Sequence, residues 1–254
     1  MTIEGLVGTP AAFDADIHKA RPHAGQIKVA RKVRSLLGNK HQKSEITDSW
    51  PVSRVQDPYT LRCIPQVHGI SHDIVQFCDK IITGKFGYVW SKSRLFSDEI
   101  CSSNANPMVL DKTMMNNGNF HGEYLAKAAD YLCLAVHELG NMSERRIERL
   151  CNPSCSELES FLAVDSGLNT GFMMAHVTAS ALVSESKTLC HPGSVDSVPT
   201  AANYEDHVSM SGWSGRKLLQ LIDNVALVLG DHKQLIPIIT YTLSNRIACS
   251  LSSC

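Results

Sequence analysis

Three short polar segments carry side chains that could bind a small substrate and move its protons. Residues 55–63 read VQDPYTLRC, residues 117–123 read NGNFHGE and residues 199–210 read PTAANYEDHVSM. They offer an amide, a phenol, a guanidinium, carboxylates and imidazoles. Guanidinium groups bind carboxylates, and carboxylates and imidazoles act as general acids and bases. The three segments are therefore the candidates for a binding or catalytic site.

The first segment predicts a short helix with a polar face. Asp57 is placed to cap this helix and Pro58 to open it. Gln56, Tyr59 and Arg62 then share one side, because they follow one another at three-residue spacing. An arginine fork binds a carboxylate through two parallel hydrogen bonds, so this face suits an amino acid or an organic acid. The alternative is a solvated turn with a surface arginine.

The second segment is a loop of glycine and asparagine that places Phe120 at a helix entrance. Its alternative interpretation is the capped start of a helix. The third segment sets Glu205, Asp206 and His207 side by side before another helix. One of these groups could act as a base or as the partner of a basic ring. The alternative is a helix N-terminus that acidic residues stabilise.

Helices are predicted to position these segments. Helices are predicted for the segments 26–37, 124–139, 144–150, 170–187 and 213–229. In these segments apolar residues recur at helical spacing, or helix-breaking residues are few. Ser143 is the predicted N-cap of the 144–150 helix, and Pro153 is predicted to stop it. No convincing strand alternation appears, so we predict an all-α fold of long packed helices.

The overall composition excludes several classes of protein. The chain has 254 residues, a formal net charge of −1 and 43% hydrophobic residues, enough for a sizeable core. This charge balance gives no basis for a nucleic-acid or membrane partner. The best apolar run, residues 172–183, is too short to cross a bilayer, and nothing resembles a signal peptide. We therefore expect a cytoplasmic protein.

Nine scattered cysteines favour free thiols in a reducing compartment over a disulfide framework. The alternative is a zinc site built from Cys151, Cys155, Cys190 and His191. Their spacing fits none of the common zinc patterns, so we predict no metal site.

Residues 56–69, QDPYTLRCIPQVHG, resemble a signature of the histidine ammonia-lyases. Phenylalanine ammonia-lyases share only the Gln-Asp-x-Tyr-x-Leu-Arg part. Further similarity to the histidine branch lies at 118–123 and from 166 through 191–197 to 205–210. The resemblance runs from Thr2 to Leu229 and has two breaks.

The resemblance implies an all-helical homotetramer that converts L-histidine to urocanate and ammonia, the first step of histidine catabolism, at sites shared between subunits. Arg62 would bind the substrate carboxylate, while Tyr59 and Gln56 would line the reacting centre. Phe120 would pack near the electrophile, and Glu205 would face the imidazole or assist proton movement. Phenylalanine-specific relatives carry glutamine in place of this glutamate.

The family makes its electrophile, a methylidene-imidazolone, from an internal Ala-Ser-Gly, and this sequence contains none. The resemblance places that tripeptide upstream of Met1, together with a tyrosine base and an imidazole-binding histidine. We therefore expect half of an active site, no bound cofactor, and no activity of the chain alone. Met1 would then be an internal methionine or the start of a truncated gene model. The alternatives are a non-catalytic subunit that joins full-length lyase chains, and a plain helical protein.

The predicted organisation is the C-terminal part of an ammonia-lyase domain over residues 1–229, its central bundle incomplete at both ends. Residues 84–97 are an insert foreign to the family, for which we hypothesise a retained intron, the alternative being a true loop insertion. Residues 230–254 form a divergent tail in which Pro237 is expected to interrupt the helix.

Overall fold

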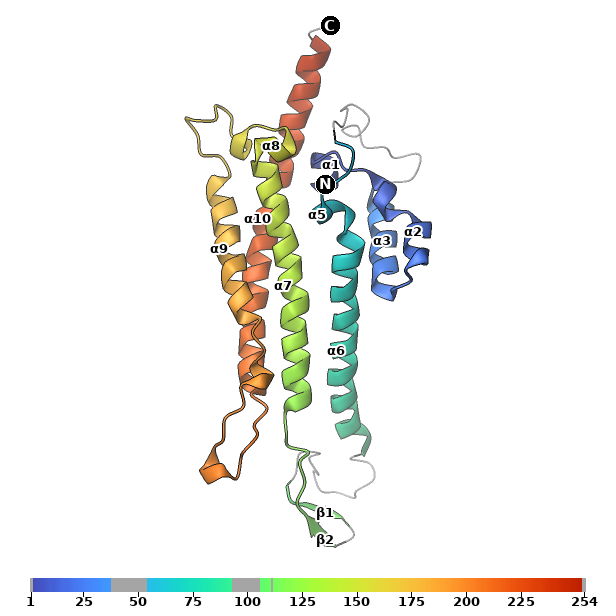
Figure 1. Cartoon of the computed structure of the whole chain (residues 1–254), viewed down its shortest axis with the longest axis vertical. Helices are drawn as coiled ribbons and strands as arrows, with labels where there is room; N and C mark the ends of the chain where they lie inside the picture. Colours follow the sequence, from blue (N-terminus) through green and yellow to red (C-terminus); the bar gives the residue numbers. More distant parts are fainter. Residues whose placement is uncertain (1, 38–53, 93–105, 111, 253–254) are drawn as a thin grey trace. The chain divides into compact units, whose positions relative to one another are not determined.

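The computed structural model describes residues 2–37, 54–92, 106–110 and 112–252, and most of them are helical (Figure 1). The helices are α1 (Thr2–Gly5), η1 (Pro10–Phe13), α2 (Ala15–Ala20), α3 (Ala24–Leu36), α5 (Tyr59–Arg62), α6 (Ile64–Lys92), α7 (Glu123–Cys151), α8 (Pro153–Ser156), η2 (Ser160–Leu162), α9 (Met173–Leu189), η3 (Gly193–Val195), η4 (Ala201–Asn203) and α10 (Ser211–Ser252). The predicted all-α class is confirmed.

One small strand pair departs from this prediction. Strand β1 (Met108–Leu110) pairs antiparallel with β2 (Thr113–Met115), and Lys112 between them has a positive φ of 64°. Three residues are too few to display the alternation by which a strand is recognised in a sequence. The expectation of no strand is therefore wrong at this hairpin.

The chain divides into two compact units. The first unit comprises Met1–Asp73, Ala135–Thr188 and Leu221–Cys254, and the second comprises Ile74–Leu134 and Leu189–Gln220. Helices α6, α7 and α10 contribute residues to both units.

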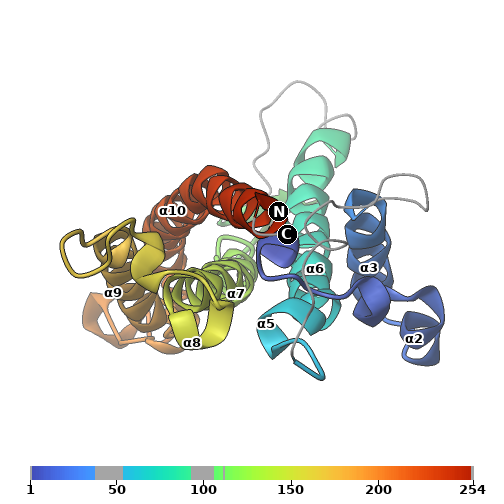
Figure 2. The same ribbon diagram turned by 90° about the horizontal axis from the view of Figure 1, so that it is seen from above.

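The core of the first unit joins helices that are far apart in the sequence. In Figures 1 and 2, α7, α9 and α10 run side by side. The buried apolar cluster consists of Leu6, Leu61, Ile147, Leu150, Cys151, Leu158, Leu162, Ala179, Val183 and Val228. Because Leu61 belongs to α5, this short helix is anchored in the core by its apolar side.

Helix α7 is continuous where the sequence predicted two helices. The hydroxyl of Ser143 donates to the Leu139 carbonyl oxygen at 2.8 Å, so it does not cap a helix. A Cβ at Gly140 would lie 2.9 Å from Cγ2 of Val225 on α10. Gly140 therefore permits close packing and does not end the helix. The predicted stop at Pro153 is confirmed, since α7 ends at Cys151.

Glu144 is a buried carboxylate in this helix and does not mark a helix end. It accepts hydrogen bonds from the Arg145 guanidinium and from Ser180 Oγ at 2.9 Å, and it lies 3.4 Å from His176 Nε2. Burial alone would raise the pKa of Glu144, but these hydrogen bonds and the charge of Arg145 lower it below its usual value. The carboxylate therefore joins α7 to α9.

The helix break predicted at Pro237 does not occur. Helix α10 continues through Pro237 to Ser252. A proline inside a helix removes one backbone hydrogen bond at a cost of about 3 kcal/mol, and the remaining bonds of this 42-residue helix stay in place. Residues 84–92, the first part of the predicted insert, continue α6, and residues 93–97 lie outside the described residues. The origin of the insert stays a hypothesis.

A buried arginine holds α5 against α7. Arg146 is 7% exposed, and its Nε donates to the Thr60 carbonyl oxygen at 3.0 Å. Its Nη2 donates to His68 Nε2 at 3.1 Å, so this nitrogen is an acceptor and the proton of the neutral ring is on Nδ1. Burial, with the charge of Arg146, lowers the pKa of His68 to about 4. Burial is also the main cause that lowers the pKa of His232 on α10 to about 4.

Helices α3 and α6 cross at two glycines in the first unit. A Cβ at Gly25 would lie 2.1 Å from the Gly69 carbonyl oxygen, and a Cβ at Gly69 would lie 2.6 Å from the Gln26 nitrogen. The Gly25 N–H donates to Asp73 Oδ2 at 3.2 Å. Figure 2 shows α3 beside α6. Side chains at these two positions would separate the helices.

We therefore predict that Gly25→Ala lowers the free energy of unfolding by about 1–3 kcal/mol or more, because the backbones must move apart. Gly215→Ala in α10 is the matched control, since a Cβ there meets no atom within 4 Å. It should be neutral or stabilise the helix by up to about 1 kcal/mol. Urea unfolding followed by circular dichroism measures both variants. Equal midpoints would contradict the close helix crossing.

The pKa of His68 predicts a loss of stability in acid. His68 has its ordinary pKa of 6.5 in the unfolded chain and a pKa of about 4 in the folded chain. As the pH falls from 6.5 toward about 4, the unfolded chain therefore takes up a proton at His68 that the folded chain does not. The free energy of unfolding should drop by up to about 2 kcal/mol for this residue between about pH 7.5 and about pH 5. His68→Gln should show a smaller drop than the wild type in urea titrations at the two pH values. His191→Gln, at an exposed position, should retain the wild-type drop. An unchanged drop in His68→Gln would contradict the assignment.

Candidate functional site

The one-turn helix predicted after Pro58 is present, but Asp57 does not cap it. Asp57 Oδ2 accepts from the Thr9 N–H at 2.7 Å, and its Oδ1 accepts from Arg54 Nε at 2.9 Å. Pro58 itself is the N-cap residue of α5 and makes no side-chain cap. Asp57 instead fixes the start of the chain to the segment that leads into α5.

Tyr59 and Arg62 lie together on α5, as their spacing predicted. The Arg62 guanidinium carbon lies 4.8 Å from the centroid of the Tyr59 ring, which is a cation–π contact. Tyr59 is 71% exposed, so its phenol is accessible. Gln56 is exposed in the bend before the helix. Two of the three predicted residues are therefore in contact, and the third precedes them in the chain.

The guanidinium group of Arg62 contains a hydrogen-bond donor that a ligand could use. Among the described residues, its Nε is buried and has no hydrogen-bond partner. A buried donor without a partner costs about 1–3 kcal/mol, and a carboxylate ligand would satisfy it with a charge-assisted bond. Because Arg146 binds the Thr60 carbonyl oxygen, the backbone that carries Tyr59 and Arg62 is fixed to α7.

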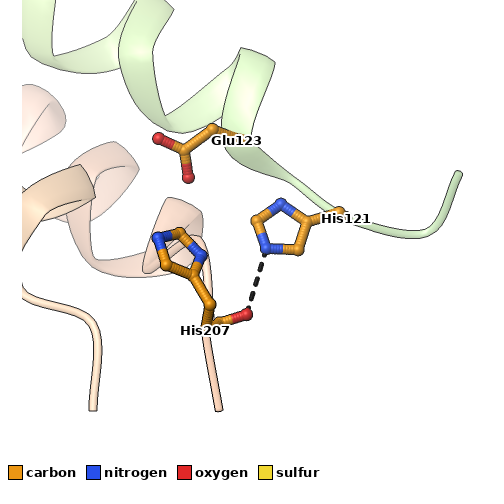
Figure 3. Close-up of side chains that lie close together, drawn as sticks. All are labelled: His121, Glu123 and His207. Atoms are coloured by element: carbon orange, nitrogen blue, oxygen red, sulfur yellow. Dashed lines mark hydrogen bonds between the residues drawn. The ribbon is translucent and has the colours of Figure 1, made fainter. Parts of the chain in front are cut away.

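The second unit brings together parts of the other two predicted segments (Figure 3). His121 precedes α7, Glu123 is its first residue, and His207 comes from the loop between η4 and α10. The two imidazole rings stack with centroids 5.6 Å apart, and His121 Nε2 lies 3.2 Å from the His207 carbonyl oxygen. One ligand atom from each of the three side chains lies within 4.8 Å of the others.

Close packing fixes these two segments. A Cβ at Gly122 would lie 2.7 Å from Ser211 Oγ and 2.9 Å from Ser209 Oγ. The Val208 N–H donates to Ser197 Oγ at 2.9 Å, which ties the loop before α10 to the preceding segment. A side chain at position 122 would therefore displace the Ser209 and Ser211 hydroxyl groups.

A buried carboxylate in α7 supports the same loop. Asp130 accepts from the backbone N–H groups of Gly193 at 3.1 Å and Ser194 at 2.9 Å, and it lies 4.0 Å from Lys217 Nζ. Burial alone would raise the pKa of Asp130, but the hydrogen bonds from Ser194 and Gly193 lower it. Lys217 also donates to the His191 carbonyl oxygen. The loop is thus bound to α7 and α10.

The predicted site residues Phe120 and Glu205 belong to this second unit, while Gln56, Tyr59 and Arg62 belong to the first. Phe120 is 56% exposed. Glu205 is also exposed, and its Oε2 accepts from Thr200 Oγ1 at 2.5 Å.

The turn that carries Glu205 is closed by backbone bonds. The Thr200 N–H donates to the Glu205 carbonyl oxygen at 3.0 Å, and the Glu205 N–H donates to the Thr200 carbonyl oxygen at 3.3 Å. Between them, Ala201, Ala202 and Asn203 all have positive φ angles of 47°, 50° and 72°. The carboxylate of Glu205 therefore extends from a tight, left-handed turn.

Sequence reasoning missed the grouping of His121, Glu123 and His207, although all three residues lie in the segments that it singled out. The signal was the presence of histidine in both segments, but His121 and His207 are 86 positions apart. Among the described residues, His121, Glu123 and His207 form the group whose potential metal-ligating atoms lie close together. The cysteines and His191, which the sequence offered as zinc ligands, are not part of this group. Within the same residues, no helix is both long enough and apolar enough to cross a membrane.

Known proteins resemble this chain in sequence. The family profile described as aromatic amino acid lyase matches residues 1–233. Histidine ammonia-lyase of Bos taurus is 55% identical over 232 residues, which are 90% of this chain and 33% of the relative. Histidine ammonia-lyase of Caenorhabditis elegans is 47% identical over 230 residues, 90% of this chain and 32% of the relative. The chain thus spans about a third of the length of these relatives.

Solved structures resemble it in fold. Histidine ammonia-lyase from Trypanosoma cruzi aligns with a TM-score of 0.74 and 44% identity, covering 93% of this chain and 42% of that one. Phenylalanine aminomutase of Pantoea agglomerans aligns with a TM-score of 0.79 and 26% identity, covering 99% and 51%. The sequence match over most of the chain, together with these folds, shows that the chain belongs to the aromatic amino acid lyase family.

Proposed function

We propose that this chain is part of a histidine ammonia-lyase, which converts L-histidine to urocanate and ammonia in the cytoplasm. The observation that carries the proposal is the pairing of Tyr59 with Arg62 on α5, with Arg62 Nε unpartnered among the described residues. The relatives named histidine ammonia-lyase support the choice of substrate.

The reaction breaks one C–H bond at the substrate Cβ and the C–N bond at Cα, and a double bond forms between the two carbons. One proton and one ammonia molecule leave. Arg62 binds the carboxylate of L-histidine, which holds Cα and Cβ beside the Tyr59 phenol. A phenol at hydrogen-bond distance can receive or return a proton, so Tyr59 is the proposed catalytic group on α5. Gln56 provides an amide that completes the polar contacts of the substrate.

Glu205 serves the imidazole side of the substrate in this proposal and Phe120 packs near the electrophile, at sites shared between lyase subunits. The hydroxyl of Thr200 orients the Glu205 carboxylate, which then accepts a hydrogen bond from the imidazole or assists proton movement. Phe120 offers an exposed aromatic face against which a planar ring can pack. A carboxylate suits a basic ring, whereas an amide would favour a neutral one.

The methylidene-imidazolone of this family forms from Ala-Ser-Gly, and the 254 residues contain no such tripeptide. The residues present therefore do not supply this group, and we propose that it comes from outside them. The chain alone is then inactive, and its site residues act when further lyase polypeptide is present.

Exposed apolar side chains favour assembly with other chains. Large apolar residues are exposed on the described helices, namely Tyr131, Leu134, Met174, Val177, Leu219, Ile222, Leu227 and Leu229. Exposed apolar side chains on helices can be buried by protein–protein contact. We infer an assembly with lyase subunits, a tetramer as in the family. The second candidate is a non-catalytic subunit in such an assembly.

Complementation tests the role of Arg62. A full-length histidine ammonia-lyase that carries alanine at the position matching Arg62 is expected to be inactive, and mixing it with this chain should restore urocanate formation. Arg62→Lys in this chain should lower the restored kcat/KM by about 10- to 100-fold, mainly through KM, because lysine lacks the bidentate fork. Arg31→Lys, at an exposed arginine of α3, should restore activity like the wild type. Urocanate made by the chain alone would overturn the proposal, as would equal restoration by Arg62→Lys.

The role of Glu205 is tested in the same way with a full-length lyase altered at the position matching Glu205. Glu205→Gln should lower the restored kcat/KM for L-histidine at least about tenfold, because the carboxylate partner of the imidazole is lost. Asp206→Asn, one residue further along the exposed loop, is the matched control and should restore activity fully. If both variants restore the same activity, Glu205 has no special role.

A further inference from the structure

His121, Glu123 and His207 form a group whose chemistry the proposed lyase reaction does not use. Two imidazoles and one carboxylate converge from the start of α7 and the loop before α10 (Figure 3). Their ligand atoms lie within 4.8 Å of one another. We propose that these three side chains bind a divalent transition-metal ion of the zinc class.

The set of donor atoms determines which metal fits. Nitrogen and oxygen ligands of this kind suit zinc, cobalt or nickel, whereas magnesium and calcium prefer oxygen ligands alone. Zinc binds imidazole nitrogen and carboxylate oxygen at about 2.0–2.2 Å, so tetrahedral ligand atoms lie about 3.3–3.5 Å apart. The side chains need to move inward by about 1 Å from the present arrangement to reach that distance. Three protein ligands leave the fourth position for water.

The hydrogen bond of His121 prepares it to bind a metal ion. Its Nε2 lies 3.2 Å from the His207 carbonyl oxygen and donates its proton there. The lone pair of Nδ1 is then available to the ion. Metal-binding histidines commonly donate their other ring N–H to a backbone carbonyl or a carboxylate, which fixes both the tautomer and the ring orientation.

Glu123 has an oxygen atom that is available for the ion. Its Oε1 lies 3.3 Å from Lys127 Nζ. Among the described residues, its Oε2 is buried and has no hydrogen-bond partner. A buried carboxylate oxygen without a partner is costly, and a cation between the two imidazoles would provide that partner. Lys127 neutralises part of the carboxylate charge, and its ammonium also donates to Ser194 Oγ at 3.1 Å.

The backbone of the site is fixed without the ion. The close approach of Gly122 to Ser209 and Ser211 fixes the two segments against each other. Because Phe120 precedes His121 and Glu205 lies two residues before His207, a bound ion would restrict the segments that carry both residues. The metal site itself does not rest on the lyase proposal, and its test requires no activity.

Isothermal titration of the metal-free chain with zinc chloride tests the proposal. We expect one ion to be bound at this site with a dissociation constant in the micromolar range or lower. Glu123→Gln and His207→Ala should each weaken this binding at least about tenfold. Cobalt substitution should give visible absorption bands that the same two variants lose. His191→Ala, at an exposed histidine paired with Asp196, is the matched control and should bind like the wild type.

The variants separate this site from the chain's nine cysteines, because zinc held by thiolates is not lost in His207→Ala. Glu123→Gln keeps the shape of the side chain, and its far-UV circular dichroism should match the wild type. The proposal is overturned if the wild type binds no ion at about 100 μM zinc. It is also overturned if Glu123→Gln and His207→Ala bind zinc as tightly as the wild type.

Discussion

The buried guanidinium of Arg146 is the interaction on which the geometry of the proposed substrate site depends. A charged group loses its hydration when it is buried, and this cost must be recovered through hydrogen bonds of good geometry. Arg146 makes such bonds to the Thr60 carbonyl oxygen and to His68 Nε2. Since Thr60 lies within α5, the same bonds that stabilise the cation also fix the helix that carries Tyr59 and Arg62. Helices α5, α6 and α7 are therefore joined through one side chain.

The second unit contains a buried negative charge, Asp130, whereas the first unit contains the buried positive charge of Arg146. Asp130 accepts two backbone N–H groups from the loop before α10, and the ammonium of Lys217 lies near it. A buried carboxylate can stay ionised in such a setting, because backbone dipoles and a cation replace water. In each unit, a buried charge on α7 thus fixes a loop or short helix that bears candidate site residues.

Much of the fold was predictable from the sequence, because helix periodicity is a local property. The predicted helices 26–37, 170–187 and 213–229 correspond to α3, α9 and α10, although α9 begins only at Met173. The contact between Tyr59 and Arg62 followed from their spacing. The errors arose where tertiary contacts outweigh local preference. Helix α7 is continuous where two helices were predicted, with Val225 packed against Gly140, and Asp57 bonds to the Thr9 N–H instead of capping α5. The group of His121 and His207 depends on a contact between distant segments, which one sequence does not encode in any local pattern.

The left-handed turn at residues 200–205 holds Glu205 in place at a conformational cost. Two of its three left-handed residues are alanines, and each costs roughly 1–2 kcal/mol in that conformation. The bonds between Thr200 and Glu205 oppose this cost. The position of Glu205 therefore depends on hydrogen bonds that offset the unfavourable backbone conformation of two alanines.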